Sequence, residues 1–293
     1  MIRTLALLAA TFALLFHAPA QAYGFFAHEA VARIAMLNVR PDTARRVRAL
    51  LGRSALLETP GCDAATPEAA STWPDCIRAM GLRFAYTAPW HYQNVDICKP
   101  FDLKSACANG NCVSAQVDRQ VKLLQDRTVP AREKVAALAF LIHFVGDLHT
   151  PPHAGDRGDR GGNDVKAAYG DYVAPWVNLH SIWDSPIAER ALTTPPSPIR
   201  TYGAAERAEL AGGTTEDWSR EGWQVSRDVV YALALDGDPC GPRPEGRVVY
   251  TNDDIERAIA PQRLQATRAG LRLARLLDEA FDPANAFTPQ PRR

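Results

Sequence analysis

The chain has 293 residues, and its 33 basic and 33 acidic side chains give a formal net charge of zero. A neutral chain has no overall field that would attract a polyanion, so any nucleic-acid ligand must be held by a local site. The length exceeds that of a typical domain but is compatible with one large hydrophobic core.

The N-terminus has the pattern of a secretory signal peptide. A basic start, M-I-R-T, precedes an apolar run from Leu5 to Phe16 and the small-residue sequence A-P-A-Q-A, which predicts cleavage after Ala22. This run is shorter than the roughly 20 apolar residues of a membrane-spanning helix, and no later stretch approaches that length. We therefore expect a signal peptide over residues 1–22 and one exported domain over residues 23–293, periplasmic or secreted.

Six cysteines in an exported chain predict three disulfides. Their positions alone leave every pairing open. Free buried thiols are the alternative, which the oxidising environment outside the cytoplasm disfavours.

The first half of the mature chain has mainly helical patterns. We expect a helix that begins near His28, a second over residues 41–57, and a third that carries Asp75 and Arg78 one turn apart. A polar surface residue is the simplest alternative for His28, and a surface ion pair is the simplest for Asp75 with Arg78.

The next segment, P-W-H-Y-Q-N-V-D, is rich in aromatic and β-branched residues and predicts extended or irregular chain. It holds His91, Tyr92 and Asn94. For Tyr92 an ordinary core aromatic is an equally good interpretation.

Helical patterns return over residues 114–125 and 131–149, and the second helix is strongly apolar. It carries His143 and Asp147 four residues apart, hence on one face, and the break at Pro151 places His153 just beyond its end. An imidazole and a carboxylate in so apolar a helix would be costly to bury unless a metal ion satisfied them. His149 points off that face, so we interpret it as a supporting or surface residue.

After His153 a glycine-rich charged segment, A-G-D-R-G-D-R-G-G-N-D, predicts a mobile loop that covers or admits ligands to a nearby site. The sequence W-V-N-L-H-S-I-W-D then repeats the four-residue spacing with His180 and Asp184. Two amphipathic helical stretches, residues 204–235 and 253–281, complete a mainly α chain.

Imidazole together with carboxylate favours zinc over magnesium or calcium, which prefer shells made only of oxygen. The six histidines of the mature chain and these aspartates suffice for more than one zinc ion.

The motifs Y-G-x-x-x-H, W-P-D-x-x-R, W-H-Y, H-F-x-G-D-x-H-x-P-x-H followed by G-G-N, and N-L-H-x-x-W-D occur in this order from Tyr23 to Asp184. In that order they resemble the S1/P1 nuclease family, which shares its fold with the zinc-dependent phospholipases C. The resemblance implies a mainly α, single-domain fold of the phospholipase C/P1 nuclease type, with a trinuclear zinc site at the bottom of a cleft.

The resemblance also implies a ligand set for each zinc ion. The first ion would be held by Asp75, His91, His143 and Asp147. The second would be held by the backbone amine and carbonyl of Tyr23, by His28 and by Asp147. The third would be held by His153, His180 and Asp184. Because Tyr23 would ligate through its free amine, signal cleavage would be part of making the site.

On this resemblance the protein would be an endonuclease and 3′-nucleotidase that hydrolyses single-stranded DNA and RNA to 5′-phosphorylated products through a metal-activated hydroxide. Arg78 would stabilise negative charge on the phosphate beside the catalytic Asp75 and Asp147. Tyr92 would stack on a nucleobase and Asn94 would contact its edge, which favours single strands because duplex bases hide their faces.

Three departures from the family pattern stand out. Tyr23 replaces a tryptophan, Ala27 replaces a glycine and Asn94 replaces a common aspartate, and the last leaves the base preference open. The family also implies the pairings Cys107 with Cys112 and Cys98 with Cys240, which leaves Cys62 with Cys76.

Two other functions stay in competition. A phospholipase C-like phosphodiesterase would use the same metals but would need an apolar rim around the cleft. A non-catalytic zinc-binding or interaction protein would hold metal without turnover. For the nuclease we expect no membrane partner and a monomer.

Overall fold

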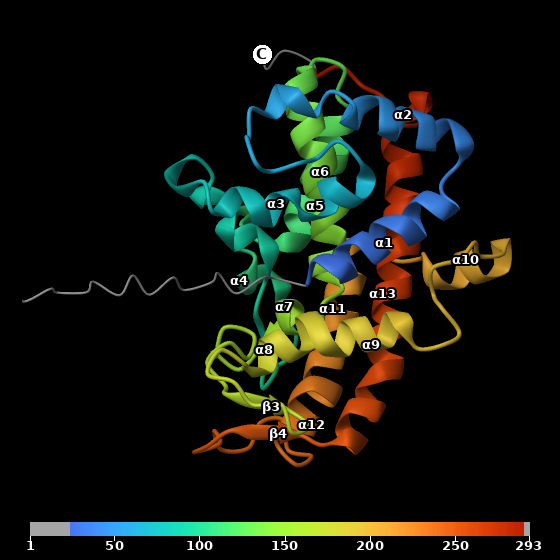
Figure 1. Ribbon diagram of the computed structural model, residues 1–293. Helices are drawn as coiled ribbons and strands as arrows, with labels where there is room; N and C mark the ends of the chain where they lie inside the picture. The colour runs from blue at the N-terminus through green and yellow to red at the C-terminus, as the bar shows by residue number, and fades with distance from the viewer. Residues whose placement is uncertain (1–23, 290–293) are drawn as a thin grey trace, which may run out of the picture.

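The computed structural model describes residues 24–289, so the predicted signal peptide and Tyr23 lie outside the described residues. Two long helices, α6 and α13, run side by side through the molecule (Figure 1). The helix α6 packs against α3 and α5, and α13 packs against α1 and α9. The apolar faces of these helices form the largest hydrophobic cluster.

The α-helices are α1 (Phe25–Asn38), α2 (Pro41–Leu51), α3 (Pro67–Arg78), α4 (Leu103–Ala106), α5 (Val113–Gln125), α6 (Ala131–Leu148), α7 (Pro151–Ala154), α8 (Leu179–Ile182), α9 (Ala188–Thr193), α10 (Ala204–Leu210), α11 (Thr215–Val225), α12 (Ala232–Ala234) and α13 (Asn252–Ala280). Short 3₁₀ helices are η1 (Ser54–Leu57), η2 (Gly81–Arg83), η3 (Ala85–His91), η4 (Ala108–Gly110) and η7 (Pro283–Asn285), and π-helical turns are η5 (Trp183–Ile187) and η6 (Ser226–Tyr231). Two parallel strand pairs join β1 (Val95–Asp96) to β2 (Gly155–Asp156) and β3 (Ala167–Tyr169) to β4 (Val248–Tyr250).

The prediction of a mainly α fold with disulfides is confirmed. The bridges Cys98–Cys240 and Cys107–Cys112 are those that the family resemblance implies, and Cys62–Cys76 is the pair that remained. All six cysteines lie among the described residues and are paired, so the alternative of free thiols is wrong.

The end of α6 follows directly from the sequence. Alanine, leucine and other straight-chain residues continue the helix, which stops at Leu148 because prolines follow closely. Thr150, the residue before Pro151, has the extended conformation that a following proline favours, with φ −88° and ψ 111°. Pro151 then starts the single turn α7, which carries His153.

The helix α11 packs closely on α7 through a glycine. A Cβ atom at Gly222 would lie 2.8 Å from the Cβ of Ala154, closer than side chains normally approach. A larger residue at this position would therefore displace the turn that carries His153.

Two predicted helices are shorter than expected. The helix predicted over residues 41–57 ends at Leu51, and a separate 3₁₀ turn follows Gly52. The stretch over residues 204–235 divides after α10 because Gly213 has φ +85°, a conformation that favours glycine, and Thr214 then caps α11. Residues 85–91, part of which we predicted as irregular or extended chain, form η3, whereas residues 95–96 form β1.

Candidate metal centre

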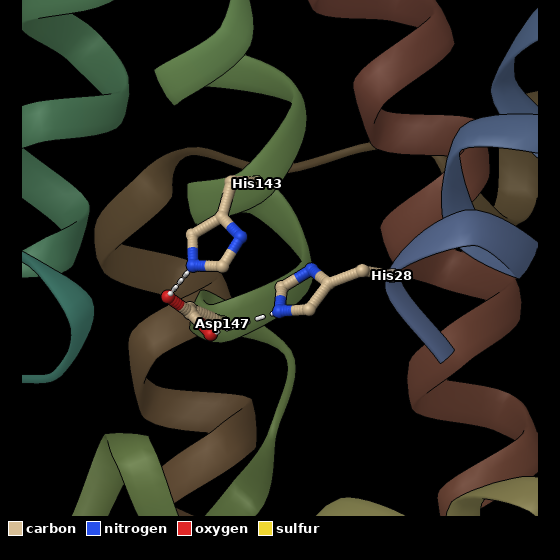
Figure 2. A group of neighbouring side chains, drawn as sticks. All are labelled: His28, His143 and Asp147. Atoms are coloured by element: carbon tan, nitrogen blue, oxygen red, sulfur yellow. Dashed lines mark ion pairs between the residues drawn. The ribbon is translucent and has the colours of Figure 1, made fainter. Parts of the chain in front are cut away.

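The helix α6 carries two fully buried polar side chains one turn apart, His143 and Asp147. Nε2 of His143 lies 2.9 Å from Oδ2 of Asp147. His28 approaches the same carboxylate from α1, with its ring stacked on that of His143 and its Nε2 3.4 Å from Oδ1 of Asp147 (Figure 2). Asp147 thus presents one oxygen to each of two histidines, as a carboxylate that bridges two ions would.

Asp75 from α3 and His91 from η3 meet His143 on its other side. Nδ1 of His91 lies 3.0 Å from Oδ2 of Asp147, 2.9 Å from Nε2 of His143 and 3.6 Å from Oδ1 of Asp75. One ligand atom each from Asp75, His91 and His143 lie within 4.8 Å of one another, and the same holds for His28, His143 and Asp147. Side chains from four separate elements therefore surround one carboxylate.

The third group forms where α7 meets α8. Nε2 of His180 lies 3.0 Å from Oδ2 of Asp184, and Nε2 of His153 lies 3.5 Å from Oδ1 of the same residue. Asp184 lies in the π-helical turn η5, a wider helix type that is frequent at functional sites. The two histidine rings stack with centroids 4.9 Å apart, so both nitrogens face the carboxylate.

Backbone carbonyls orient three of these histidines. Nδ1 of His143 lies 2.7 Å from the carbonyl oxygen of Ser71. Nδ1 of His153 lies 2.8 Å from the carbonyl oxygen of His91, and Nδ1 of His180 lies 2.8 Å from the carbonyl oxygen of Gly161. Since a carbonyl only accepts, each Nδ1 carries a proton, and Nε2, which bears the lone pair in the neutral ring, is the nitrogen that faces the group. This arrangement is typical of metal-ligating histidine.

The buried atoms of these groups test whether they fit a cation. Within residues 24–289, several buried ligand atoms have no hydrogen-bond partner: Asp75 Oδ2, His91 Nε2, Asp147 Oδ1, His153 Nε2 and both carboxylate oxygens of Asp184. The His180–Asp184 pair is close but not aligned for a hydrogen bond, as expected when both atoms face a common third point. Each buried unpaired polar group costs about 1–3 kcal/mol, a cost that a bound metal ion would offset. The residues therefore fit divalent cations.

The charges of these groups favour a cation as well. Burial lowers the pKa of His153, but the negative charges of Asp147 and Asp184 outweigh burial and raise the pKa to about 9. For Asp147, burial raises the pKa, and the neighbouring charges of His143 and His153 bring it well below its usual value. Burial and the charge of His143 lower the pKa of His28 to about 4, which keeps that imidazole neutral and able to ligate.

A cavity of about 290 Å³ opens above the group that contains His91 and the group that contains His153 and His180, and it is called the catalytic pocket below. Its lining consists of Arg78, His91, Tyr92, Asn94, His153, Arg160, Asn163 and His180. Three predicted ligands thus share one pocket with all three residues predicted to contact the substrate.

Arg78 and Tyr92 both present their side chains to solvent. Nη1 of Arg78 lies 3.2 Å from Oδ1 of Asp75, so the surface ion pair considered for these residues forms at the edge of the metal centre. Tyr92 is 41% exposed and is therefore not a core aromatic. Asn94 has φ +49°, a left-handed conformation that asparagine tolerates better than most residues.

Sequence reasoning missed Arg160 and Asn163 in the pocket wall. They lie in the segment of residues 157–164, here called the glycine loop, which we predicted only as a mobile cover. The G-G-N motif was the available signal, because Gly161 and Gly162 have φ of +66° and +84°. A Cβ at Gly161 would lie 2.4 Å from the carbonyl oxygen of Pro152, so the loop is pressed against α7. Its mobility stays a prediction.

Two more histidine expectations have a clear outcome. His28 and His149 are both buried, so a surface position is wrong for each. The His149 ring faces away from the metal ligands: its Nδ1 donates to the carbonyl of Val145 at 2.7 Å and its Nε2 accepts from Nη1 of Arg272 at 2.9 Å.

Tyr23 lies outside the described residues, and its predicted ligand role stays a prediction. The described chain begins at Gly24, whose backbone N–H donates to the carbonyl oxygen of Asp184 at 2.7 Å. The first described residue is therefore anchored at the third group.

Comparison with known proteins accords with these motifs and this geometry. The family model described as S1/P1 Nuclease matches residues 23–282. The chain belongs to the S1/P1 nuclease family. The resemblance inferred from the sequence is confirmed over residues 23–282.

Relatives in this family are 24% to 31% identical to the chain over the aligned residues. Endonuclease 3 from Arabidopsis thaliana is 30% identical over 178 residues, which cover 59% of this chain and 56% of that protein. Nuclease S1 from Aspergillus oryzae is 25% identical, with 87% of this chain and 91% of that protein covered. Nuclease P1 from Penicillium citrinum is 24% identical, with 88% and 97% covered.

Coverage differs among these relatives. The matched part spans 56%, 60% and 65% of the lengths of Endonucleases 3, 2 and 4 from Arabidopsis thaliana. Among solved structures, the alpha toxin from Clostridium absonum aligns with a TM-score of 0.46 at 16% identity, with 89% of this chain and 65% of that chain covered. That likeness is too weak to carry an argument.

Proposed function

We propose that this protein is a zinc-dependent endonuclease and 3′-nucleotidase that hydrolyses single-stranded DNA and RNA to 5′-phosphorylated products. The observation that carries the proposal is the convergence of three histidine and aspartate groups, two of which reach one pocket that also exposes an arginine and a tyrosine. Membership of the S1/P1 nuclease family and relatives named nuclease S1 and nuclease P1 support the same activity.

The donor set supports zinc as the metal, since imidazole nitrogen and carboxylate oxygen together suit zinc better than magnesium or calcium. The ligand sets are proposed as Asp75, His91, His143 and Asp147 for the first ion; Tyr23 backbone atoms, His28 and Asp147 for the second; and His153, His180 and Asp184 for the third. Bound zinc would supply Lewis-acid polarisation of the phosphate and would acidify the attacking water.

The chain's own residues would position the phosphodiester next to the bound zinc. Arg78 lies in the pocket wall, where its guanidinium can donate to a phosphate oxygen while Asp75 fixes its position at 3.2 Å. Because the positive charge is already in place, negative charge that develops on the phosphate is stabilised without reorganisation. Asp147 would keep the histidines around it in one arrangement.

Tyr92 and Asn94 would bind the base next to the scissile phosphate. An exposed aromatic face accepts any unpaired base, and a duplex base cannot reach it without unstacking. Preference for single strands then follows from the chemistry of stacking, while Asn94 offers both a donor and an acceptor to a base edge.

A phospholipase C-like phosphodiesterase finds less support. An acyl chain would need an apolar rim, whereas the pocket is lined by Arg78, Asn94, Arg160, Asn163 and imidazoles. A non-catalytic zinc protein would give no role to the exposed Arg78 beside the metal centre.

We also propose that the protein is exported and acts as a monomer. Three disulfides support an oxidising compartment, periplasmic or extracellular. No helix within residues 24–289 is long and apolar enough to cross a membrane.

The test is turnover of single-stranded DNA, RNA and 3′-AMP by the mature chain beginning at Tyr23, with zinc content measured on the same sample. Cleavage to 5′-phosphate ends with nearly three zinc ions per chain, and loss of activity in Asp147→Asn, would support the proposal. Nearly three zinc ions per chain without cleavage would contradict the proposal. Assays with phospholipid substrates would then distinguish a phosphodiesterase from a binding protein.

A further inference from the structure

A second cavity, of about 390 Å³, lies on the far side of the glycine loop from the catalytic pocket. Asp159 and Asp164 of the loop line this cavity, whereas Arg160 and Asn163 of the same loop line the catalytic pocket. Neighbouring residues of one loop thus face two cavities, so the two are separated by little more than the thickness of that loop.

Four cations line the second cavity: Arg157, Lys166, Arg243 and Arg247. We call it the cation pocket. Within residues 24–289 none of the four has a carboxylate partner within ion-pair distance, whereas Arg160, in the same loop as Arg157, pairs with Asp164. Their charges are therefore not neutralised by a direct ion pair.

Backbone carbonyls hold three of these guanidinium groups in place. Arg157 donates to the carbonyl of Gly241, Arg243 donates to that of Gly158 at 3.0 Å, and Arg247 donates to that of Ala167 at 2.6 Å. A carbonyl carries no formal charge, and a guanidinium has five N–H donors, so donors and charge both remain for a ligand. Nε of Arg157 is buried and has no hydrogen-bond partner.

Two of the three carboxylates that line this pocket already have hydrogen-bond or ion-pair partners. Asp159 accepts from the hydroxyl of Tyr231 at 2.5 Å and from the N–H of Gly162 at 2.9 Å. Asp164 lies 3.0 Å from the guanidinium of Arg160. Glu245 is exposed and is the remaining acidic residue of the lining.

The remaining wall is apolar and includes Val165, Leu179, Ala234 and Leu235. A cavity of this size with an apolar wall and fixed cations matches a ligand that has a flat apolar part and a phosphate. A nucleotide unit has both.

We propose that the cation pocket binds a nucleotide of the same single strand, next to the one held in the catalytic pocket, through its phosphate. This inference rests on the proposed nuclease function and deepens it. The pocket distinguishes a polynucleotide from a 3′-mononucleotide, because only a strand is long enough to pass the glycine loop. It also supplies the local positive charge that a chain of zero net charge needs in order to hold a polyanion.

The glycine loop would connect the two pockets mechanically. Its Gly161 carbonyl lies 2.8 Å from Nδ1 of His180 on one side, and its Gly158 carbonyl accepts from Arg243 on the other. A strand bound in both pockets would therefore contact a loop that is hydrogen-bonded to the proposed metal ligand His180.

The test uses the variant Lys166→Gln, since this side chain is exposed and, unlike that of Arg243, does not hold the glycine loop, so its removal should impair neither folding nor the catalytic pocket. The matched control, Arg45→Gln, removes the same charge from the exposed face of α2, at the opposite end of the molecule from β3 and β4 (Figure 1). Each protein is assayed for cleavage of a thymidylate 12-mer, for hydrolysis of 3′-AMP, and for binding of a fluorescent 12-mer with uncleavable phosphorothioate linkages.

We expect the Lys166→Gln variant to bind the 12-mer roughly fivefold more weakly, with KM for its cleavage raised to match and 3′-AMP hydrolysis unchanged. The slope of log affinity against log salt should shrink by about 0.7, the value for one phosphate contact on a single strand. Unchanged 12-mer binding, an equal loss in the α2 control, or an equal loss of 3′-AMP hydrolysis would each overturn the inference. If the wild type cleaves neither substrate, the proposed function fails, and the binding measurement still decides whether the pocket holds a strand.

Discussion

Asp147 lies between two imidazoles that come from different helices: its Oδ2 is 2.9 Å from Nε2 of His143 on α6, and its Oδ1 is 3.4 Å from Nε2 of His28 on α1. A single buried carboxylate therefore contacts histidines of more than one group that can hold a metal ion, since His143 also belongs to the group with Asp75 and His91. Asp184, in contrast, has both partners in one group. This difference makes the two aspartates distinguishable by experiment.

Replacement of Asp147 by asparagine should remove two of the three proposed zinc ions, because a neutral amide is a poor ligand and the carboxylate is shared. Asp184→Asn should remove about one. The measurement is zinc per chain by atomic emission after gel filtration. Equal losses in the two variants would show that Asp147 does not bridge.

Removal of zinc should lower the thermal unfolding midpoint. Metal that binds only the folded chain stabilises it by about 4 kcal/mol at a free concentration 1,000 times its dissociation constant. The EDTA-treated chain also retains buried polar atoms that lack partners, such as Asp184 Oδ1. Calorimetry with and without EDTA tests this, with zinc added back as the control. An unchanged midpoint at reduced zinc content would contradict the prediction.

The metal-free protein should be most stable near pH 6.5. His153 has its pKa raised to about 9, so the stability it contributes is complete below its unfolded value of 6.5 and is lost as pH rises toward 9. His28 has its pKa lowered to about 4, so its contribution is complete above 6.5 and is lost as pH falls toward 4. Urea unfolding of the EDTA-treated chain between pH 4 and 9 measures both limbs.

The loss of stability between pH 6.5 and 9, the alkaline limb, has a specific control. In His153→Gln the loss of stability between pH 6.5 and 9 should be much smaller, because the titrating group is gone. An unchanged alkaline limb in this variant would assign the effect to another residue.

Arg272 should help to hold the metal centre without touching it. Its guanidinium donates to Nε2 of His149 at 2.9 Å and to both carboxylate oxygens of Glu221 at 2.7 and 3.0 Å. Through these contacts, the buried residues His149 and Arg272 connect the segment between Asp147 and His153 to α11 and α13. Arg272→Met should therefore weaken zinc retention by roughly 10-fold or more, as loss of supporting contacts typically does.

Arg275 is the matched control for Arg272, since the two guanidinium groups lie 5.1 and 5.0 Å from the ring centroid of Trp218. Arg275 donates to the carbonyl of Gly213 and does not contact His149. Arg275→Met should leave zinc affinity unchanged in a competition assay with a chelating dye. Equal zinc affinities in Arg272→Met and wild type would refute a supporting role, whatever the change in unfolding temperature.

Tyr92→Ala should weaken binding of single strands by about 1–3 kcal/mol, the usual cost of losing one base–aromatic stack, while Tyr92→Phe should bind normally. Tyr86 offers a control, because it is 58% exposed in η3 but packs on Trp90 and does not line the pocket. The measurement is anisotropy of a labelled uncleavable oligonucleotide. Similar losses in Tyr86→Ala and Tyr92→Ala would exclude a specific platform.

Much of the metal centre was predictable because its signals are local. The pairs His143 with Asp147 and His180 with Asp184 lie four residues apart, and helical geometry alone puts such residues on one face. The prolines after α6 likewise predict where that helix ends and the turn that carries His153 begins. The order of the motifs was sufficient to identify the family.

Tertiary structure decided what spacing cannot express. That Asp75, His91 and His143 meet depends on α3 and η3 packing against α6, and that His149 is buried depends on Arg272, 123 residues away in the chain. The glycine loop faces two cavities only because its Gly161 is pressed against α7 and its Gly158 carbonyl accepts from Arg243. Sequence determines local geometry through bond rotations, whereas distant side chains meet only when burial of the apolar faces brings their elements together.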